Sequence, residues 1–177
     1  MPATPDRPPL VAMLILLLLA ACSDSRPKAR WTPDDALLID IQPLEGGRLS
    51  SRFGWREHHP ILKRPAFHAG IDWAAPTGTP VRAAADGTVV AVHPGLGGYG
   101  NYVRIDHVGS VQSVYAHLSR FASGMGPGRR VRKGQMIGRV GRTGRATGPH
   151  LHFELHVAGQ PIDPLRAASY ALATPIR

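Results

Sequence analysis

The segment from Gly148 to Val157 constrains the fold of this chain more than any other. It reads Gly-Pro-His-Leu-His-Phe-Glu-Leu-His-Val and alternates apolar and polar residues. A period of two is typical of a half-buried β-strand. Imidazole is a common zinc ligand, so the polar face is a candidate metal site, although a strand can also expose histidines that have no role. The apolar face carries Leu151, Phe153, Leu155 and Val157, and the polar face carries His150, His152, Glu154 and His156.

Short candidate strands separated by turns fill the middle of the chain. Gly and Pro number 20 and 17, and no helical period persists in this region. Two hairpins are expected, around Asp86-Gly87 and around Val108-Gly109-Ser110, while 55–66 and 119–130 read as loops. The pattern predicts an all-β fold, mainly an antiparallel sheet. The remaining strands are expected at 49–53, 67–73, 81–84, 88–93, 102–107, 111–117 and 135–140.

The length of 177 residues suits one domain with a core and terminal extensions. A hydrophobic content of 43% is that of a globular protein. We expect a signal peptide at 1–21, a flexible tether at 22–43, the folded domain at 44–165 and a C-terminal tail at 166–177. The tether is inferred from its charges, its prolines and its lack of a clear period.

A targeting signal is expected at the N-terminus. The apolar run from Leu10 to Ala21 is too short to span a bilayer but suits the core of a signal peptide. It ends in Leu19-Ala20-Ala21-Cys22, which resembles a bacterial lipobox, in which cleavage before the cysteine leaves it lipid-modified. The alternative is ordinary cleavage after Ala20 or Ala21, which leaves a free thiol. Cys22 is the only cysteine, so any metal ligands must be His, Asp or Glu.

Positive charge is concentrated in one part of the chain. The formal net charge is +9, and no Asp or Glu occurs between His107 and Glu154. The cations there are interleaved with Gly rather than with aromatic residues, so no nucleic-acid partner is expected. An anionic wall polymer or a membrane surface suits an exported chain better, and solvated loop charges are the plain alternative. These cations are Arg120, Arg129, Arg130, Arg132, Lys133, Arg139, Arg142 and Arg145.

Further candidate metal ligands lie outside the histidine-rich strand. His68 and Asp72 are four residues apart and share a strand face, and His117 ends another strand. Three ligands with an open fourth position make a catalytic zinc site, whereas four closed ligands make a structural one. Iron and metals that prefer oxygen ligands are not excluded by these residue types. No His-Glu-x-x-His pattern supplies a glutamate base, so spare imidazoles are the candidates for proton transfer in a hydrolytic enzyme.

Taken in order, these motifs resemble the lysostaphin/LytM-type family of peptidoglycan zinc metalloendopeptidases. The likeness rests on Phe67-His68-Ala69-Gly70-Ile71-Asp72, on Tyr115-Ala116-His117-Leu118 and on 144–154, and it runs from about Leu49 to Pro164. It implies an antiparallel β-sheet with an open groove walled by loops. The segment 55–66 is where this chain departs from the family pattern.

The resemblance implies a role for each site residue. His68, Asp72 and His152 would bind one Zn²⁺ per chain, while His117 and His150 would stay off the metal, near the attacking water and the developing oxyanion. His156 lies roughly 13 Å beyond His152 along the strand, so we do not expect it to be a ligand. Tyr115, which shares the face of His117, and Asn101 are candidates for the substrate groove. The alternatives are a packed aromatic ring for Tyr115 and a loop–strand cap for Asn101.

The expected function is hydrolysis of peptide bonds in peptidoglycan stem cross-links or bridges during cell-wall remodelling. The expected partners are peptidoglycan and a membrane, reached through a lipid anchor on Cys22. The location is the cell envelope, on the periplasmic face of the outer membrane if the host has two membranes, because Ser23 rather than Asp follows the cysteine. The alternatives are a zinc-trapping lipoprotein and a non-catalytic peptidoglycan-binding or amidase-activating module. Relatives of the latter kind lack site residues, whereas this chain lacks none.

Overall fold

The computed structural model describes residues 39, 42–58, 61, 63–95 and 97–167, which form thirteen strands and one short 3-10 helix. The expected signal peptide with Cys22, most of the tether and the last ten residues lie outside this part of the chain. Within the expected tether, Ile39 packs against the core and Pro43 is buried. Among the described residues, no helix is long and apolar enough to cross a membrane.

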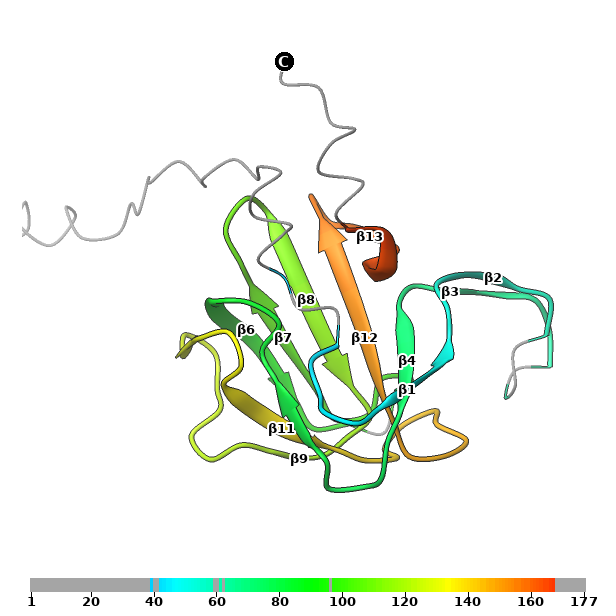
Figure 1. Ribbon diagram of the computed structural model, residues 1–177, viewed down its shortest axis with the longest axis horizontal. Helices are drawn as coiled ribbons and strands as arrows, with labels where there is room; N and C mark the ends of the chain where they lie inside the picture. Colours follow the sequence, from blue (N-terminus) through cyan, green and yellow to red (C-terminus); the bar gives the residue numbers. More distant parts are fainter. Residues whose placement is uncertain (1–38, 40–41, 59–60, 62, 96, 168–177) are drawn as a thin grey trace, which may run out of the picture.

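The largest sheet has the strand order β1-β4-β12-β8-β7-β6-β10, and β13 pairs with β12 in addition (Figure 1). Every strand pair in it is antiparallel, as expected. The histidine-rich strand β12 (His150–Val157) lies between β4 (Ile71–Ala74) and β8 (Val111–Ala116), so two neighbours hold it in register. The other strands of this sheet are β1 (Arg48–Ser51), β6 (Gly87–His93), β7 (Tyr102–Asp106), β10 (Arg130–Val131) and β13 (Gln160–Ile162).

The two faces of β12 divide as its alternation predicts, but both are covered. Leu151, Phe153 and Leu155 are at most 1% exposed and belong to the hydrophobic core. On the polar face, His152 is 6% exposed and Glu154 only 1%. Buried polar groups must find hydrogen-bond partners, so this polar face is a built site rather than a solvated surface.

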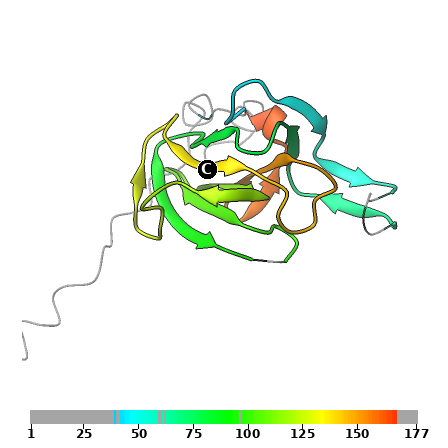
Figure 2. The same ribbon diagram turned by 90° about the horizontal axis from the view of Figure 1, so that it is seen from below.

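A second sheet of three strands covers the apolar side of the first. It has the order β5-β11-β9, with β5 at Pro80–Arg82, β9 at Leu118–Phe121 and β11 at Met136–Val140. Figure 2 shows β11 lying across the strands of the large sheet. The fully buried side chains of Val81, Leu118 and Ile137 from this layer join the same core cluster as Phe153. The fold is thus nearly all β, in two layers.

The prediction of a hairpin at Asp86-Gly87 is wrong. β5 pairs with β11 in the small sheet, whereas β6 pairs with β7 and β10 in the large one, so this segment crosses between the layers. Asp86 is held by long-range partners: its Oδ1 accepts from the Lys133 N–H at 2.7 Å, and its carbonyl accepts from Nδ1 of His107 at 2.7 Å. The hairpin expected around Val108-Gly109-Ser110 is confirmed, since β7 and β8 pair directly.

Both segments that read as loops contain strands. In the first, β2 (Gly54–Arg56) pairs with β3 (Ala66–His68) in a separate two-stranded hairpin. Aromatic rings hold its base, with centroids of Phe53 and Phe67 5.1 Å apart and those of Trp55 and Phe67 5.8 Å apart. The second segment includes most of β9 and the start of β10. These strands are only two to four residues long, too short for an alternating pattern to be recognised.

Candidate metal centre and active site

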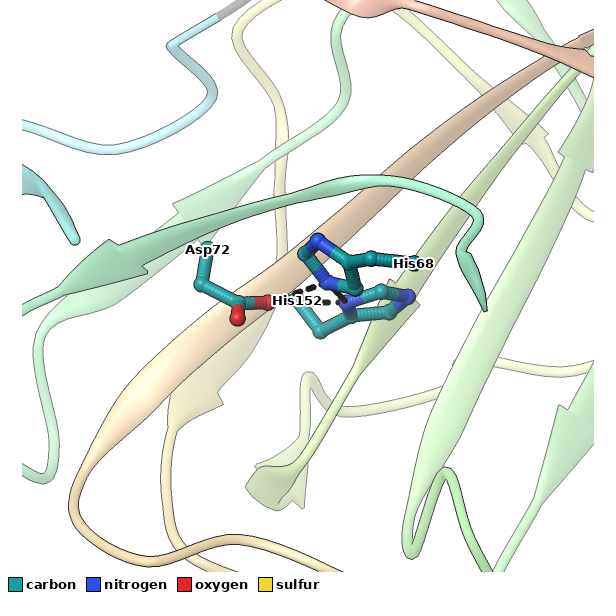
Figure 3. A group of neighbouring side chains, drawn as sticks. All are labelled: His68, Asp72 and His152. Carbon is teal, nitrogen blue, oxygen red and sulfur yellow. Dashed lines mark hydrogen bonds and ion pairs between the residues drawn. The ribbon is translucent and has the colours of Figure 1, made fainter. Parts of the chain in front are cut away.

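Three strands bring His68, Asp72 and His152 together (Figure 3). Asp72 on β4 and His152 on β12 are direct partners across the sheet. His68 ends β3, and the strand expected at 67–73 is interrupted by Ala69 and Gly70 before β4 begins. A Cβ at Gly70 would lie 2.3 Å from the Phe153 carbonyl oxygen, so only glycine lets this turn approach β12 closely enough to bring His68 to the group.

The ligand atoms of the three residues lie within 4.8 Å of one another. Oδ1 of Asp72 is 2.8 Å from Nδ1 of His152 and 3.1 Å from Nε2 of His68, and the two ring nitrogens are 3.0 Å apart. The other nitrogen of each imidazole ring already makes a hydrogen bond. Nδ1 of His68 donates to the Arg52 carbonyl at 2.7 Å, and Nε2 of His152 donates to Glu154 at 2.8 Å.

This donor set fits a metal ion. In a neutral imidazole one nitrogen carries the proton and the other a lone pair. The partners of His68 and His152 take the protonated nitrogens, so both lone pairs point at the Asp72 carboxylate. Two lone pairs and a carboxylate converging on one point repel each other unless a cation lies between them. Two histidines and one carboxylate are also a ligand set that catalytic zinc sites use.

Electrostatics at the group favour positive charge. Burial opposes the charged form of His152, but when a proton rather than a metal ion occupies its Nδ1, the hydrogen bonds to Asp72 and Glu154 raise its pKa to about 9. Burial likewise opposes ionisation of Asp72, yet hydrogen bonds from the protonated rings of His152 and His68 hold the pKa of that carboxyl well below its usual range. A metal ion and a proton compete for the same imidazole lone pair, and a site that stabilises the proton stabilises the ion for the same reason.

Hydrogen bonds with neighbouring side chains hold the candidate ligands in place. Arg56 on β2 pairs with Oδ2 of Asp72 at 3.0 Å and also contacts the Ser51 hydroxyl. Glu154 accepts from His152, from the Tyr99 hydroxyl at 2.7 Å and from Nε2 of His156 at 2.7 Å. Burial opposes the charged form of Glu154, but the bonds from His152 and His156 lower its pKa to about 2. Local sequence patterns indicate no role for Arg56, Tyr99 or Glu154, and the only signal is that Glu154 shares a face with His152.

His117 and His150 lie beside this group without joining it. Their ring centroids are 4.6 Å apart, and Nε2 of His150 is 3.8 Å from Oδ1 of Asp72, beyond hydrogen-bonding distance. Nδ1 of His117 donates to the Thr143 carbonyl at 2.8 Å, and Nδ1 of His150 donates to the Gly148 carbonyl at 2.9 Å. Each ring therefore has a lone pair on Nε2. Burial, and then electrostatic repulsion between the protonated forms of His117 and His150, lower the pKa of His117 to about 4.

The expectation that Tyr115 shares a face with His117 and lines the groove is wrong. Tyr115 is fully buried, its ring packs against Phe153 at 5.4 Å, and its hydroxyl accepts from the Ala84 N–H. His117 has a φ of 61°, which breaks the alternation between β8 and β9 and turns its ring into the site. The Asn101 side chain accepts from the Gly95 N–H and donates to the Leu118 carbonyl, so it joins a loop to a strand.

A cavity of about 420 Å³ opens over the group. His117 and His150 line it together with the three candidate ligands. Its walls come from the β2–β3 hairpin through Arg56 and Phe67, from the Gly-rich loop through Tyr99, and from the turn before β12 through Arg145. The open groove implied by the resemblance is thus present, and one of its walls comes from 55–66, the segment where a departure from the family pattern is expected.

Comparisons with known proteins agree with this geometry. The family model described as Peptidase family M23 matches residues 66–164. The chain is 53% identical over 137 residues to the DD-carboxypeptidase/endopeptidase Mpg of Neisseria meningitidis, and 47% identical over 122 residues to the peptidoglycan DD-endopeptidase ShyA of Vibrio cholerae. These matches cover 77% and 68% of this chain. The chain spans only 30% and 27% of the lengths of those two relatives.

Solved structures show the same fold. A zinc-containing peptidase from Vibrio cholerae superposes with a TM-score of 0.66 at 35% identity, covering 72% of this chain and 39% of the other. The catalytic domain of lysostaphin from Staphylococcus simulans superposes with a TM-score of 0.63 at 28% identity, covering 74% of this chain and 98% of that domain. The resemblance to lysostaphin-type enzymes is therefore confirmed, and the chain belongs to peptidase family M23.

Proposed function

We propose that this chain is a zinc-dependent endopeptidase that hydrolyses peptide bonds in peptidoglycan stem cross-links or bridges. The observation that best supports it is the convergence of two imidazole lone pairs and one carboxylate beside two further imidazoles with free Nε2 atoms. The relatives are consistent with this reaction, since one is named a peptidoglycan DD-endopeptidase and one structure is that of a zinc-containing peptidase.

His68, Asp72 and His152 would hold the ion. When bound, Zn²⁺ supplies Lewis acidity, which polarises a carbonyl and lowers the pKa of water towards about 7. His117 is neutral at neutral pH, because its pKa is about 4, so its Nε2 is available to accept a proton from the attacking water. His150, 4.6 Å away between ring centroids, is placed to donate to the developing oxyanion or to return a proton to the leaving amine.

We further propose that the mature protein is held in the cell envelope by lipid on Cys22, facing the periplasm from the outer membrane if the host has two membranes. The support is the sequence alone: an apolar run that ends in Leu-Ala-Ala-Cys, followed by Ser23. Its partners would then be this membrane and peptidoglycan. A tether that begins at Cys22 and ends before the packed residue Ile39 would let an anchored enzyme reach a polymer beside the membrane without leaving it.

The test compares the wild-type chain with His117→Ala and His150→Ala, using three measurements on each protein: release of cross-linked fragments from purified sacculi, zinc content and sacculus binding. We expect the wild type to cleave, and each variant to lose about 10²–10⁴-fold in rate while keeping its zinc. Loss of zinc together with activity would make the residue a ligand instead. A wild-type chain that binds sacculi and cleaves nothing would be a non-catalytic module.

A further inference from the structure

Four charged side chains line the cavity over the candidate metal group, and three of them have ion-pair or hydrogen-bond partners within the fold. Asp72 is paired with Arg56 and with imidazoles, and Glu154 accepts three hydrogen bonds. The fourth is Arg145. Within the part of the chain that the structure describes, its guanidinium makes no hydrogen bond or ion pair, although its backbone N–H donates to the Gly98 carbonyl at 3.0 Å. Arg145 is thus the one charged side chain of this lining without a side-chain partner among the described residues, and it is exposed.

The backbone beneath Arg145 is rigidly placed. Gly144, the residue before it, has a φ of 69°, and a Cβ there would lie 2.3 Å from the Gly100 nitrogen, so two glycines let the two loops touch. Thr143, one residue earlier, carries the carbonyl that orients His117. The backbone position of Arg145 is therefore set by the same contacts that orient His117.

The absent side chain of Gly98 makes room for the guanidinium. A Cβ at Gly98 would lie 2.6 Å from Nη2 and 3.1 Å from Nε of Arg145, so the guanidinium lies directly against this backbone. Tyr99, the next residue, has its ring centroid 5.8 Å from that of His152. The loop whose Gly98 contacts the guanidinium therefore also contacts the candidate ligand His152 through Tyr99.

We propose that Arg145 is a specificity-determining residue that binds a free carboxylate of the peptide substrate, next to the bond that is cut. A guanidinium binds a carboxylate through two parallel hydrogen bonds, which are shorter and stronger than neutral ones. The substrate class is therefore a peptide with an acidic group beside the scissile bond, rather than a neutral bridge such as a run of glycines. This inference rests on the proposed function, because it concerns the same cavity.

The test uses two synthetic cross-linked muropeptides with the same scissile bond. In one, the carboxylate on the residue that follows the bond is free; in the other it is a carboxamide. We expect the wild-type chain to prefer the acid, and Arg145→Ala to lower kcat/KM for the acid about 10–100-fold while changing the amide less than about twofold. Arg145→Lys, which keeps the charge but loses the paired hydrogen bonds, should fall between the two.

Two more variants separate position from charge. Gly98→Ala keeps the guanidinium but displaces it, so it should lower the rate with the acid and spare the amide. Arg142→Ala removes an exposed cation of the same loop that does not line the cavity, so it should change neither substrate. Equal wild-type rates on both muropeptides, or an undiminished preference in Arg145→Ala, would overturn the proposal. If the wild type cleaves neither muropeptide, the proposed function fails. Calorimetric binding of both muropeptides to wild type and to Arg145→Ala then tests separately whether Arg145 binds the carboxylate.

Discussion

Glu154 and His152 are hydrogen-bonded to each other along the same face of β12, with Oε1 of the carboxylate 2.8 Å from Nε2 of the ring. This bond places the imidazole proton on the side away from Asp72 and leaves the Nδ1 lone pair for a metal. The other three site histidines are oriented by backbone carbonyls, those of Arg52, Thr143 and Gly148. His152 is thus the one whose orientation depends on a replaceable side chain.

Replacing Glu154 with Gln should weaken zinc binding about 10–100-fold, the usual cost of changing a carboxylate that supports a metal-bound histidine. The amide can still accept a hydrogen bond from His152 but carries no charge to raise the basicity of the ring. The measurement is competition for zinc with a chelator of known affinity, using the purified chain. Tyr99→Phe, which removes one donor to the same oxygen but keeps the charge, is the matched control and should have a much smaller effect.

Zinc content should separate the candidate ligands from their neighbours. His152→Ala should lose the metal, because His68 and Asp72 alone hold zinc poorly. His156→Ala removes an imidazole from the same strand face that contacts only Glu154 among the carboxylates, and it should keep close to one zinc per chain. Elemental analysis of the two purified variants decides the matter, and full occupancy in His152→Ala would show that the ligand set is wrong.

Protonation of His107 should destabilise the fold in acid. Burial lowers its pKa below the ordinary value of 6.5, against the opposing effects of Asp86 and Asp106. The unfolded chain therefore binds a proton near pH 6.5 that the folded chain does not, so the free energy of unfolding falls as the pH drops below about 6.5. The effect of one proton is at most about 1.4 kcal/mol per pH unit.

The measurement is urea unfolding between about pH 7.5 and about pH 5, a range that spans the ordinary pKa of histidine. His107→Gln should show a shallower fall in stability than the wild type. His58→Gln, an exposed histidine of the β2–β3 hairpin, should follow the wild-type curve. Parallel curves for wild type and His107→Gln would mean that His107 titrates alike in both states.

Lipid on Cys22 should keep the mature protein on a membrane, since two or more acyl chains give stable anchoring. Cys22→Ser should move the protein to soluble or unprocessed forms in cell fractionation. Intact-mass measurement of membrane-purified wild type should find a cysteine that carries acyl chains at the new N-terminus. An unmodified thiol on that material would refute the anchor and favour ordinary cleavage after Ala20 or Ala21.

The sequence by itself determined the histidine-rich strand, its two faces and the antiparallel β class. Those features follow from side-chain alternation with a period of two, which is local and needs no partner strand. The same applies to the β7–β8 hairpin, whose turn is encoded by adjacent residues. His68, Asp72, His117, His150 and His152 were also singled out from local spacing together with the family resemblance.

Tertiary structure alone decided which strands pair and what surrounds the ligands. Asp86-Gly87 looks like a hairpin turn, but hydrogen bonds from Lys133 and His107, far away in sequence, make it a crossover. The positive φ of His117 separates its ring from that of Tyr115, which alternation alone would put on the same face. Arg56, Tyr99 and Arg145 reach the cavity from three loops or hairpins, and long-range contacts of this kind leave no periodic trace in the sequence.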